Sequence, residues 1–498
     1  MALIALIPIL LVLFLMLVLH WGSHLAALAG WCCGLLVAAL AFGLNWPVFW
    51  VSQVKGLLLT LNVVLLLWPG VFLYFLVDQI GGIRAIALAL QGMVHDRGWL
   101  LVLEAWMLSA ILESLAGFGL PIAMVAPLLI TLGVSPVMAV ASTAIGHTWA
   151  GSTGGMALSL RILSEITHYT PEALFPDSAI LLGISMILTG LAVAFLLGQK
   201  QQWWRVLITG LVVGVVHYVL GILGMISISA LLASFVGFTF GSWISKKSNA
   251  PKTDNFKNSV LRAGLIAYGV LVAIMLVVSL VPRLNQVMSS ITWTLQFPAV
   301  VSGNGTITPA ESGNLLHVLT HPGTLVIFTI LFTLVIFHFL PSVPHLDLKR
   351  TFNSTLRSAL PASLGSLFMI GLSTIMEHSG MTLTLAKSLS GLVGGIYPVF
   401  SPLVGMIGSF ATGSNVNSNV LFGALQKQVA VLVGASPIVI LAAQTTGGSL
   451  GSMIAPAKLA VGTSTNELKG REGEVLRYTL PVGLAIALVV GLAALAIS

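Results

Sequence analysis

Charged residues are scarce in this sequence of 498 residues. Lys and Arg number 21 and Asp and Glu number 14, so 7% of the chain is charged, whereas soluble globular proteins carry about 25%. A soluble enzyme of this length is excluded, because its surface would need many more charged side chains. The 57% apolar content excludes a disordered chain. We therefore expect an all-α polytopic membrane protein.

Cysteine is also scarce, and Cys32 and Cys33 are adjacent in an apolar run. Adjacent cysteines make a strained disulfide, and a metal site needs more ligands. We interpret them as packing residues and expect no metal and no cofactor. The formal net charge of +7 could suggest a nucleic-acid partner. The basic residues are instead scattered through connecting segments, which predicts contact with membrane lipid and not with nucleic acid.

Long apolar runs fill most of the chain. Each span takes about 20 residues, so we predict roughly 12 spans, within a range of about 11 to 14. The uninterrupted runs are residues 3–19, 25–44, 57–77, 100–115, 178–198, 206–223, 226–244, 260–281, 320–340, 360–376 and 475–497. Two further regions, 111–163 and 404–460, are apolar but repeatedly interrupted by Gly, Ser, Asn and Pro.

Basic residues mark alternate connections. They gather near residues 200–205, 246–262 and 349–357, whereas residues 162–198 and 285–346 contain no Lys or Arg. Basic loops lie on the cytoplasmic side of a membrane protein. The alternation therefore predicts one topology, with the three basic connections inside the cell.

The second half of the sequence repeats features of the first. Leu132-Gly-Val-Ser-Pro136 matches Val433-Gly-Ala-Ser-Pro437, and each lies between two interrupted segments. Chance similarity between Gly-rich stretches is the alternative. The first copy leads into a connection without basic residues, and the second leads into Lys469, Arg471 and Arg477. We therefore predict inverted repeats with broken helices, the pattern of a secondary transporter with a central site.

The interruptions are candidates for that site. Broken helices within a membrane are tolerated where they line a cavity, because lipid cannot satisfy their backbone groups. The N-terminus of a half-helix offers N–H groups to an anion, so a small carboxylate is the expected substrate. A polar surface loop is the alternative for the Asn-rich stretch. The predicted substrate-binding residues are Gly117, Phe118, Gly119, Ser414, Asn415, Asn417, Ser418, Asn419, Gln444 and Lys458.

Two titratable residues in the first copy are predicted to couple transport to protons. Glu113 is a carboxyl group at membrane depth, which is costly and marks a functional site by default. His147 could relay protons. The alternatives are a structural partner for a half-helix at Glu113 and a packing role at His147. Lys458 could attract an anion or extend to the membrane interface.

The same features suggest four regions. Residues 1–98 are N-terminal spans of a scaffold, and residues 99–200 are the core of the first repeat. Residues 201–380 are middle spans with a cytoplasmic loop at 246–258. Residues 381–498 are the core of the second repeat with the last span.

At the interruptions the sequence resembles the bacterial lactate permease family. Leu112-Glu-Ser-Leu-Ala-Gly-Phe-Gly-Leu-Pro-Ile122 is similar to its Leu-Glu-Gly-Ala-Ala-Gly-Phe-Gly-x-Pro-Val motif. The run Thr412-Gly-Ser-Asn-Val-Asn-Ser-Asn-Val-Leu-Phe-Gly-Ala-Leu-Gln426 resembles Thr-Gly-Ser-Asp-x-x-Ser-Asn-x-Leu-Phe-Gly-x-Leu-Gln. Gly447-Gly-Ser-Leu-Gly-Ser-Met-Ile-Ala-Pro456 resembles Gly-Gly-x-x-Gly-Lys-Met-Ile-Ser-Pro. The resemblance covers roughly residue 60 to the end of the chain.

The resemblance implies proton symport of lactate and glycolate across the bacterial inner membrane. It also implies membership of the ion transporter superfamily, whose carriers have re-entrant hairpins, and many of them move a transport domain against a scaffold like an elevator. A homodimer is implied by the same relatives. Asn415 stands where the family usually has Asp, and Lys458 replaces a small or amide residue. These departures leave sodium as an alternative coupling ion.

A passive anion channel and an intramembrane hydrolase are the two alternative classes of function. In a passive anion channel the interrupted segments would line an open pore. In an intramembrane hydrolase, Ser152 or Ser449 would be the nucleophile and His147 the base. The sequence contains no paired-Asp motif, and its Gly447-Gly-Ser-Leu-Gly451 run has the Gly-x-Ser-x-Gly spacing but lies in an apolar helical region and not at the strand-to-helix turn that a nucleophile elbow needs. We therefore expect a transporter and not an enzyme.

Overall fold

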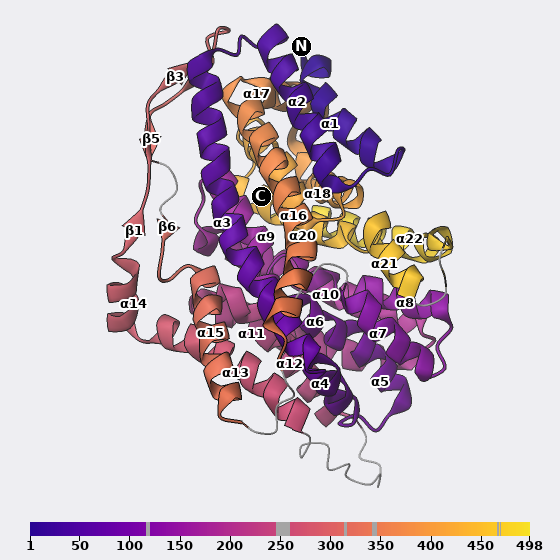
Figure 1. Ribbon diagram of the computed structural model, residues 1–498. Coiled ribbons are helices and arrows are strands. Elements are labelled where there is room, and N and C mark those ends of the chain that lie inside the picture. The colour runs from indigo at the N-terminus through magenta and orange to yellow at the C-terminus, as the bar shows by residue number, and fades with distance from the viewer. Residues whose placement is uncertain (116–119, 246–258, 313–315, 341–345, 466–467, 469) are drawn as a thin grey trace.

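The computed structural model describes residues 1–498 except 116–119, 246–258, 313–315, 341–345, 466–467 and 469. The described residues form mainly helices (Figure 1). Twelve helical segments among them are long and apolar enough to cross a membrane. The predicted polytopic helical fold and the number of spans are therefore confirmed.

The first part of the chain contains the helices that run up to and include the first set of interruptions. They are α1 (Ala2–Leu17), α2 (Ser23–Ala41), α3 (Trp46–Gln79), α4 (Gly82–Gln91), α5 (Arg97–Leu103), a π-helical turn (Glu104–Leu108), α6 (Ser109–Leu115), α7 (Leu120–Thr131), α8 (Pro136–Gly146), two 3₁₀ turns (Thr148–Gly151 and Gly155–Ala157), α9 (Leu158–Thr167) and α10 (Pro171–Leu196).

The remaining helices form a middle group and a final group. The middle group is a 3₁₀ turn (Lys200–Gln202), α11 (Trp203–Ile222), α12 (Ile226–Trp243), α13 (Ser259–Leu280), α14 (Pro282–Ser289) and α15 (Pro322–His338). The final group is α16 (Leu348–His378), α17 (Met381–Val393), a 3₁₀ turn (Gly394–Ile396), α18 (Tyr397–Thr412), α19 (Asn415–Val433), α20 (Pro437–Gly451), α21 (Pro456–Thr465) and α22 (Glu472–Ile497).

The order of elements from α3 to α10 recurs from α16 to α22. Each series begins with a long helix, of 34 residues in α3 and 31 in α16. A glycine with positive φ then turns the chain into a shorter helix, Gly81 in one series and Gly380 in the other. Each series ends with a helix of 26 residues. The matching pentapeptides occupy the same place in both series, before α8 and before α20.

Helices α3 and α16 pack side by side in opposite directions (Figure 1). Gln53 Nε2 donates to the carbonyl of Gly371 (3.3 Å), near the start of α3 and the end of α16. Thr351 Oγ1 donates to Gln79 Oε1 (2.9 Å) at the other ends. The first helices of the two series are therefore antiparallel. This direction is the one that inverted repeats require, although the inversion of the whole repeats stays a prediction.

The segment from α5 to α7 is a helical hairpin. Arg97 Nη2, at the start of α5, donates to the carbonyl of Leu132 just after α7 (2.7 Å). The chain therefore enters and leaves this hairpin on the same side. In the second series, Gly413 joins α18 to α19 with a φ of +68°, and the two helices pack against each other. A residue with a Cβ would be strained in this backbone conformation.

One segment departs from the all-α prediction. Between α14 and α15, six two-residue strands form three antiparallel pairs: β1 (Thr292–Trp293) with β6 (Leu316–His317), β2 (Gln296–Phe297) with β5 (Glu311–Ser312), and β3 (Val300–Val301) with β4 (Ile307–Thr308). We call residues 292–317 the β-hairpin. Its strands are too short to give a clear two-residue alternation, so a scan for apolar runs missed them.

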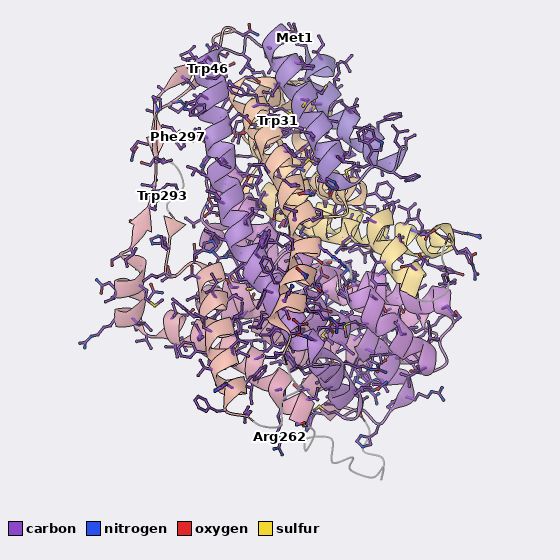
Figure 2. The ribbon with its side chains drawn as sticks, viewed as in Figure 1. Met1, Trp31, Trp46, Arg262, Trp293 and Phe297 are labelled. Carbon is purple, nitrogen blue, oxygen red and sulfur yellow. The ribbon has the colours of Figure 1, made fainter. Side chains whose placement is uncertain are left out.

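The β-hairpin lies along the first half of α3. Figure 2 shows Trp293 and Phe297 beside this helix, and Trp46 and Arg262 at opposite ends of the molecule. Asn45 Nδ2 donates to the carbonyl of Val301 (2.7 Å) and fixes the hairpin near the start of α3. Phe297 is buried in the same small apolar cluster as residues of α3.

Candidate functional site

The interruptions of both series meet at a cavity of about 110 Å³. Its polar lining comes from α6, from the start of α9, from the junction of α18 and α19, from the end of α20 and the residue that follows it, and from α21. These residues are Glu113, Ser159, Ser414, Asn415, Ser449, Ser452 and Lys458. We call this space the central cavity. The sequence analysis predicts a site between the two interrupted regions, and residues of both regions line this cavity.

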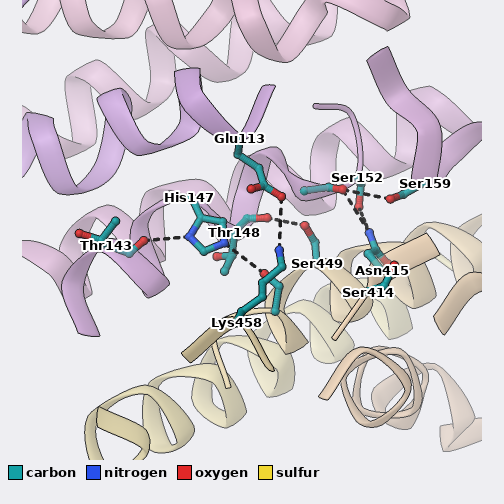
Figure 3. Close-up of polar contacts among 12 residues, drawn as sticks. Glu113, Thr143, His147, Thr148, Ser152, Ser159, Ser414, Asn415, Ser449 and Lys458 are labelled. Carbon is teal, nitrogen blue, oxygen red and sulfur yellow. Dashed lines mark hydrogen bonds and ion pairs between the residues drawn. The ribbon is translucent and has the colours of Figure 1, made fainter. Parts of the chain in front are cut away.

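Glu113 and Lys458 form an ion pair across the central cavity. Figure 3 shows the two side chains pointing toward each other from the two halves of the chain. Lys458 Nζ lies 3.4 Å from Glu113 Oε1. Only 8% of the Glu113 side chain and 12% of the Lys458 side chain are exposed. Glu113 Oε2 is buried and has no hydrogen-bond partner among the described residues. The carboxylate is thus held by one long contact and is only partly satisfied.

His147 is completely buried beside this pair. Its Nδ1 lies 2.9 Å from the carbonyl oxygen of Thr143, which can only accept a hydrogen bond. The neutral ring therefore carries its proton on Nδ1, and Nε2 is left as an acceptor. Ser452 Oγ, on the wall of the central cavity, lies 3.5 Å from Nε2. His147 reaches the central cavity through this serine and does not line it.

The first turn of α19 forms one wall of the central cavity. Ser414 is the N-cap residue, and its Oγ accepts from the backbone N–H of Asn417 (3.4 Å). The amide of Asn415 donates to Ser152 Oγ (3.0 Å) and to the carbonyl of Thr445 (3.2 Å). Asn415 Oδ1 is buried without a partner in the described part of the chain. The predicted run thus contributes a helix N-terminus and an amide to the cavity.

The other predicted amide residues lie behind this wall. Asn419 Nδ2 donates to the carbonyl of Ser159 (2.9 Å) and to Thr445 Oγ1 (2.9 Å), which joins α19 to α9 and α20. Gln444 Nε2 donates to Ser418 Oγ (3.1 Å), and Ser418 Oγ donates to a backbone carbonyl of α18. Neither these residues nor Asn417 line the central cavity. Their contacts fix the geometry of the second hairpin.

Three predicted residues, Gly117, Phe118 and Gly119, lie outside the described residues. The predicted roles of all the other site residues stay predictions too, because a position in a cavity does not by itself show binding.

Some lining residues were not predicted from the sequence. Ser449 and Ser452 belong to an interruption that the sequence identifies, but the choice of these side chains depends on local turns. Met156 and Ala157, before α9, both have a φ of +60°, which redirects the chain at the cavity. Helix α3 also contributes Leu66 and Gly70 to the lining. The helix is continuous here, and Pro69 beside Gly70 is the feature that marks this part of α3 in the sequence.

The central cavity combines one cation, one partly satisfied carboxyl group, hydroxyl groups and a helix N-terminus. No group of three or more His, Cys, Asp or Glu side chains that could hold a metal ion occurs among the described residues. The arrangement suits a small anion with polar substituents. A multi-pass helical protein with a buried polar site between two interrupted helical hairpins belongs to the class of membrane transporters.

Comparison with known proteins agrees with this class and identifies the family. The family model "L-lactate permease" matches residues 1–498, so the chain belongs to the L-lactate permease family. It is 28% identical to an L-lactate permease of Bacillus subtilis, over 98% of this chain and 94% of that protein. It is 25% identical to the glycolate permease GlcA of Escherichia coli, over 99% of this chain and 94% of that protein.

The fold resembles a solved transporter. MtrF of Neisseria gonorrhoeae, described as an antimetabolite efflux pump, gives a TM-score of 0.52 at 14% identity, over 97% of this chain and 96% of that chain. At this identity the likeness concerns the fold alone. The spans and the family together make this chain a multi-pass protein of a bacterial membrane.

Proposed function

We propose that this chain is a secondary carrier that imports small 2-hydroxy monocarboxylates, lactate and glycolate, together with protons. The observation that carries the proposal is the ion pair of Glu113 and Lys458 on the wall of the central cavity. The names of the relatives support the choice of substrate. The cavity volume of about 110 Å³ supports a substrate of a few heavy atoms.

The ion pair can couple the proton to the substrate. In the empty carrier Glu113 neutralises Lys458. A proton that binds to Glu113 removes this negative charge, and the ammonium group of Lys458 is then available for the carboxylate of the substrate. Because Glu113 holds Lys458 by a single contact of 3.4 Å, the exchange of one carboxylate for another breaks few favourable interactions. Proton binding and substrate binding thus favour each other, as thermodynamic linkage requires.

The same exchange explains why only two forms of the carrier, the empty form and the fully loaded form, would move the central cavity across the membrane. The formal charges of Glu113 and Lys458 cancel in the empty carrier. They also cancel in the carrier that holds both a proton and a monocarboxylate. A carrier with only the proton or only the substrate has a net charge within an apolar surrounding, which is costly. The uncharged states therefore move, and the coupled transport is electroneutral.

The hydroxyl group of a 2-hydroxy acid would find partners on the same wall. Ser452 lies between the cavity and His147, and Ser449 donates to the carbonyl oxygen of Thr148. Both hydroxyls can accept a further hydrogen bond from the substrate. The N-terminus of α19 would face the carboxylate together with Lys458, and the unpartnered Oδ1 of Asn415 would accept a hydrogen bond from the substrate hydroxyl.

A carrier fits these contacts better than a hydrolase. Ser152 Oγ donates to the carbonyl of Thr445 (2.8 Å) and Ser449 Oγ donates to the carbonyl of Thr148. Neither hydroxyl contacts His147 among the described interactions. Ser152 and Ser449 therefore do not form the serine–base pair that a hydrolase needs, and Ser452, whose Oγ does lie near His147 Nε2, is at the long distance of 3.5 Å.

We also propose a scaffold and a moving domain. The antiparallel helices α3 and α16 would be the scaffold, together with α2, which packs against α16, and α1, which packs against α2. The hairpins that enclose the central cavity would move. The boundaries near residues 98, 200 and 380, the inverted orientation, a homodimer, and a cytoplasmic position for the basic connections are parts of this proposal.

Purified protein in liposomes tests the function. Uptake of labelled lactate is measured with an imposed pH gradient, acid outside, and separately with a sodium gradient at constant pH. We expect saturable accumulation with the pH gradient and none with sodium alone. Accumulation driven by sodium would replace the proton with sodium in this account. Flux that never exceeds equilibrium and does not saturate would identify a channel.

A further inference from the structure

A second and larger cavity, of about 550 Å³, opens on the side of the molecule that carries the connections without basic residues. Helices α9, α10, α12, α13 and α15 and the base of the β-hairpin enclose it. Its charged and titratable lining residues are Arg161, Glu165, His168, Glu172, His317 and His321. We call this space the outer cavity. The central site described above includes none of these residues.

Arg161 is a cation in the outer cavity whose hydrogen bonds are incomplete. It lies on α9, and its Nη2 donates to Ser227 Oγ at the start of α12 (2.9 Å). Its Nε is buried and has no partner among the described residues. Glu172 and Glu165 lie near enough for their charges to act on this guanidinium. A guanidinium group offers a planar set of donors that matches a carboxylate, and part of this set is unused.

Two histidines in the same lining have defined tautomers. His321 Nδ1 accepts from the backbone N–H of Gly323 (3.2 Å), so the neutral ring carries its proton on Nε2 and can donate from it. His317 Nδ1 lies 2.9 Å from the carbonyl oxygen of Ser289 and must donate to it. The ring of His317 then offers an acceptor at Nε2. The outer cavity thus contains donors and an acceptor that suit a carboxylate with a neighbouring hydroxyl group.

One face of α3 connects the outer cavity to the central cavity. Asn62 lines the outer cavity, whereas Leu66 and Gly70 line the central cavity. Residues four positions apart lie on the same face of a helix, so these three residues form one row. On α9, Leu158 lines the central cavity and Arg161, one helical turn later, lines the outer one. The two cavities are therefore neighbours along both helices.

We propose that the outer cavity is a first binding site for the substrate carboxylate, held by the guanidinium of Arg161 before the substrate moves to the central cavity. This inference rests on the proposed function. The central cation, Lys458, is paired with Glu113 in the empty carrier. The guanidinium of Arg161, one helical turn along α9 from the central-cavity residue Leu158, concentrates monocarboxylates near a site that is not yet open to them.

The charges that face Arg161 keep this binding weak and reversible. Glu165 and Glu172 line the same cavity and oppose an anion. A weak first site does not trap the substrate, so passage to the central cavity continues.

Removal of the positive charge of Arg161 tests the outer cavity, and the KM for lactate uptake is measured in liposomes. Arg161→Gln is expected to raise the KM for lactate uptake about tenfold or more, the loss expected for a charge-assisted hydrogen bond, with little change in the maximal rate. Arg161→Lys is expected to retain most of the affinity. Arg283→Gln, which removes an exposed cation near the β-hairpin, is the matched control and should leave KM unchanged. An unchanged KM in Arg161→Gln overturns the proposal.

Restoring a positive charge at position 161 distinguishes a loss of substrate binding from a folding defect. In a chain with Cys32→Ala and Cys33→Ala, Arg161→Cys is treated with a methanethiosulfonate that adds an ammonium group, a neutral methyl group or a sulfonate. Only the ammonium reagent should lower the raised KM, and lactate should slow its reaction. Equal effects of all three reagents would show a structural role and overturn the proposal.

The outer binding site and the proposed transport function can be disproved independently. If the unmodified protein accumulates lactate and the Arg161 variants share its KM, the outer site is wrong and the proposed function stands. If the unmodified protein moves no lactate or glycolate under any gradient, the proposed function itself is wrong.

Discussion

Two Lys–Glu pairs in this protein differ in how completely their polar atoms are satisfied. Lys55 of α3 contacts Glu311 of the β-hairpin, lies 3.0 Å from His378 Nε2, and sits over the ring of Phe297 at 5.3 Å. Lys458 has the single contact of 3.4 Å with Glu113, whose second oxygen has no partner among the described residues.

The difference indicates different roles. His378 Nδ1 donates to the carbonyl of Thr374 (2.8 Å), so Nε2 must accept from Lys55. Every group around Lys55 is thus oriented to retain it, as expected for a structural pair. An incompletely satisfied buried pair is unfavourable for stability, and its retention is best explained by a ligand that replaces one partner.

The largest effect is expected from Lys458→Gln. Without the ammonium group the substrate loses its cation, and the loaded carrier acquires a net negative charge. Uptake and lactate exchange should both fall by about a hundredfold, in the range expected when a charged hydrogen-bond partner is lost. Lys458→Arg, which keeps the charge, should retain measurable exchange. Normal exchange in Lys458→Gln would show that Lys458 has only a structural role.

Glu113→Gln should separate exchange from accumulation. In this variant no carboxylate at position 113 neutralises Lys458 at any pH. The charges of Lys458 and the substrate cancel in the loaded carrier, whereas the empty carrier keeps the positive charge of Lys458. Uphill uptake driven by a pH gradient should be abolished, whereas exchange of internal for external lactate should persist within a few fold of the original rate. Glu113→Asp is the control that keeps a titratable group. Full uphill uptake in Glu113→Gln would contradict the assignment.

Asn415→Asp adds a second carboxylate to the central cavity. The change removes the amide donor that contacts Ser152 and Thr445 and places a negative charge near carbonyl oxygens. We expect lactate uptake at neutral pH to fall by about tenfold, with partial recovery in acid as the new carboxyl group becomes protonated. The pH profile of uptake checks this prediction, with Asn415→Ala as the uncharged comparison. A profile identical to that of the alanine variant would refute it.

Glu311→Gln should have the smallest effect on transport and a visible effect on stability. The pair with Lys55 holds the β-hairpin to α3, so its loss should cost about 1–3 kcal/mol of stability and leave the KM for lactate unchanged. Thermal denaturation of the purified protein measures the first effect and liposome uptake the second. A changed KM with unchanged stability would reverse the roles of the two pairs.

Acid should weaken the same contact. Partial burial alone raises the pKa of Glu311, but the hydrogen bond and charge of Lys55 outweigh burial and lower the pKa below its ordinary value. Because the folded-state pKa is the lower one, the contribution to stability is present above the ordinary pKa and is lost as pH falls through the folded value. Acid denaturation should therefore be less pH-dependent in Glu311→Gln than in the original protein.

The sequence predicts the candidate site best where a charged residue lies in an apolar segment. Glu113 and Lys458 are charged residues in apolar segments, and each signals a function by its cost. Their pairing is not predictable, because 345 positions separate them and the structure alone brings them together. Asn419 and Gln444 belong to the same polar stretches, yet they join helices to one another. The sequence does not distinguish the residues that line the central cavity from those that lie behind this lining.

The parts of the fold that sequence reasoning missed share a physical cause. The β-hairpin consists of pairs of residues that are stabilised by contacts with α3 and with the opposite strand, and not by their own periodicity. Helix α3 lines both cavities with Asn62 and Leu66 in the middle of an ordinary apolar helix. Such roles arise from tertiary contacts and leave little trace in a local pattern.

The pH dependence of lactate binding to the purified protein tests the central claim most directly. If a proton on Glu113 frees Lys458, the affinity for lactate should fall as pH rises, by up to about tenfold for each pH unit, and Glu113→Gln should bind lactate with the same affinity at every pH. Titration calorimetry at a series of pH values measures both. The same slope in both proteins, or no slope in the original, would contradict the exchange of Glu113 for the substrate at Lys458.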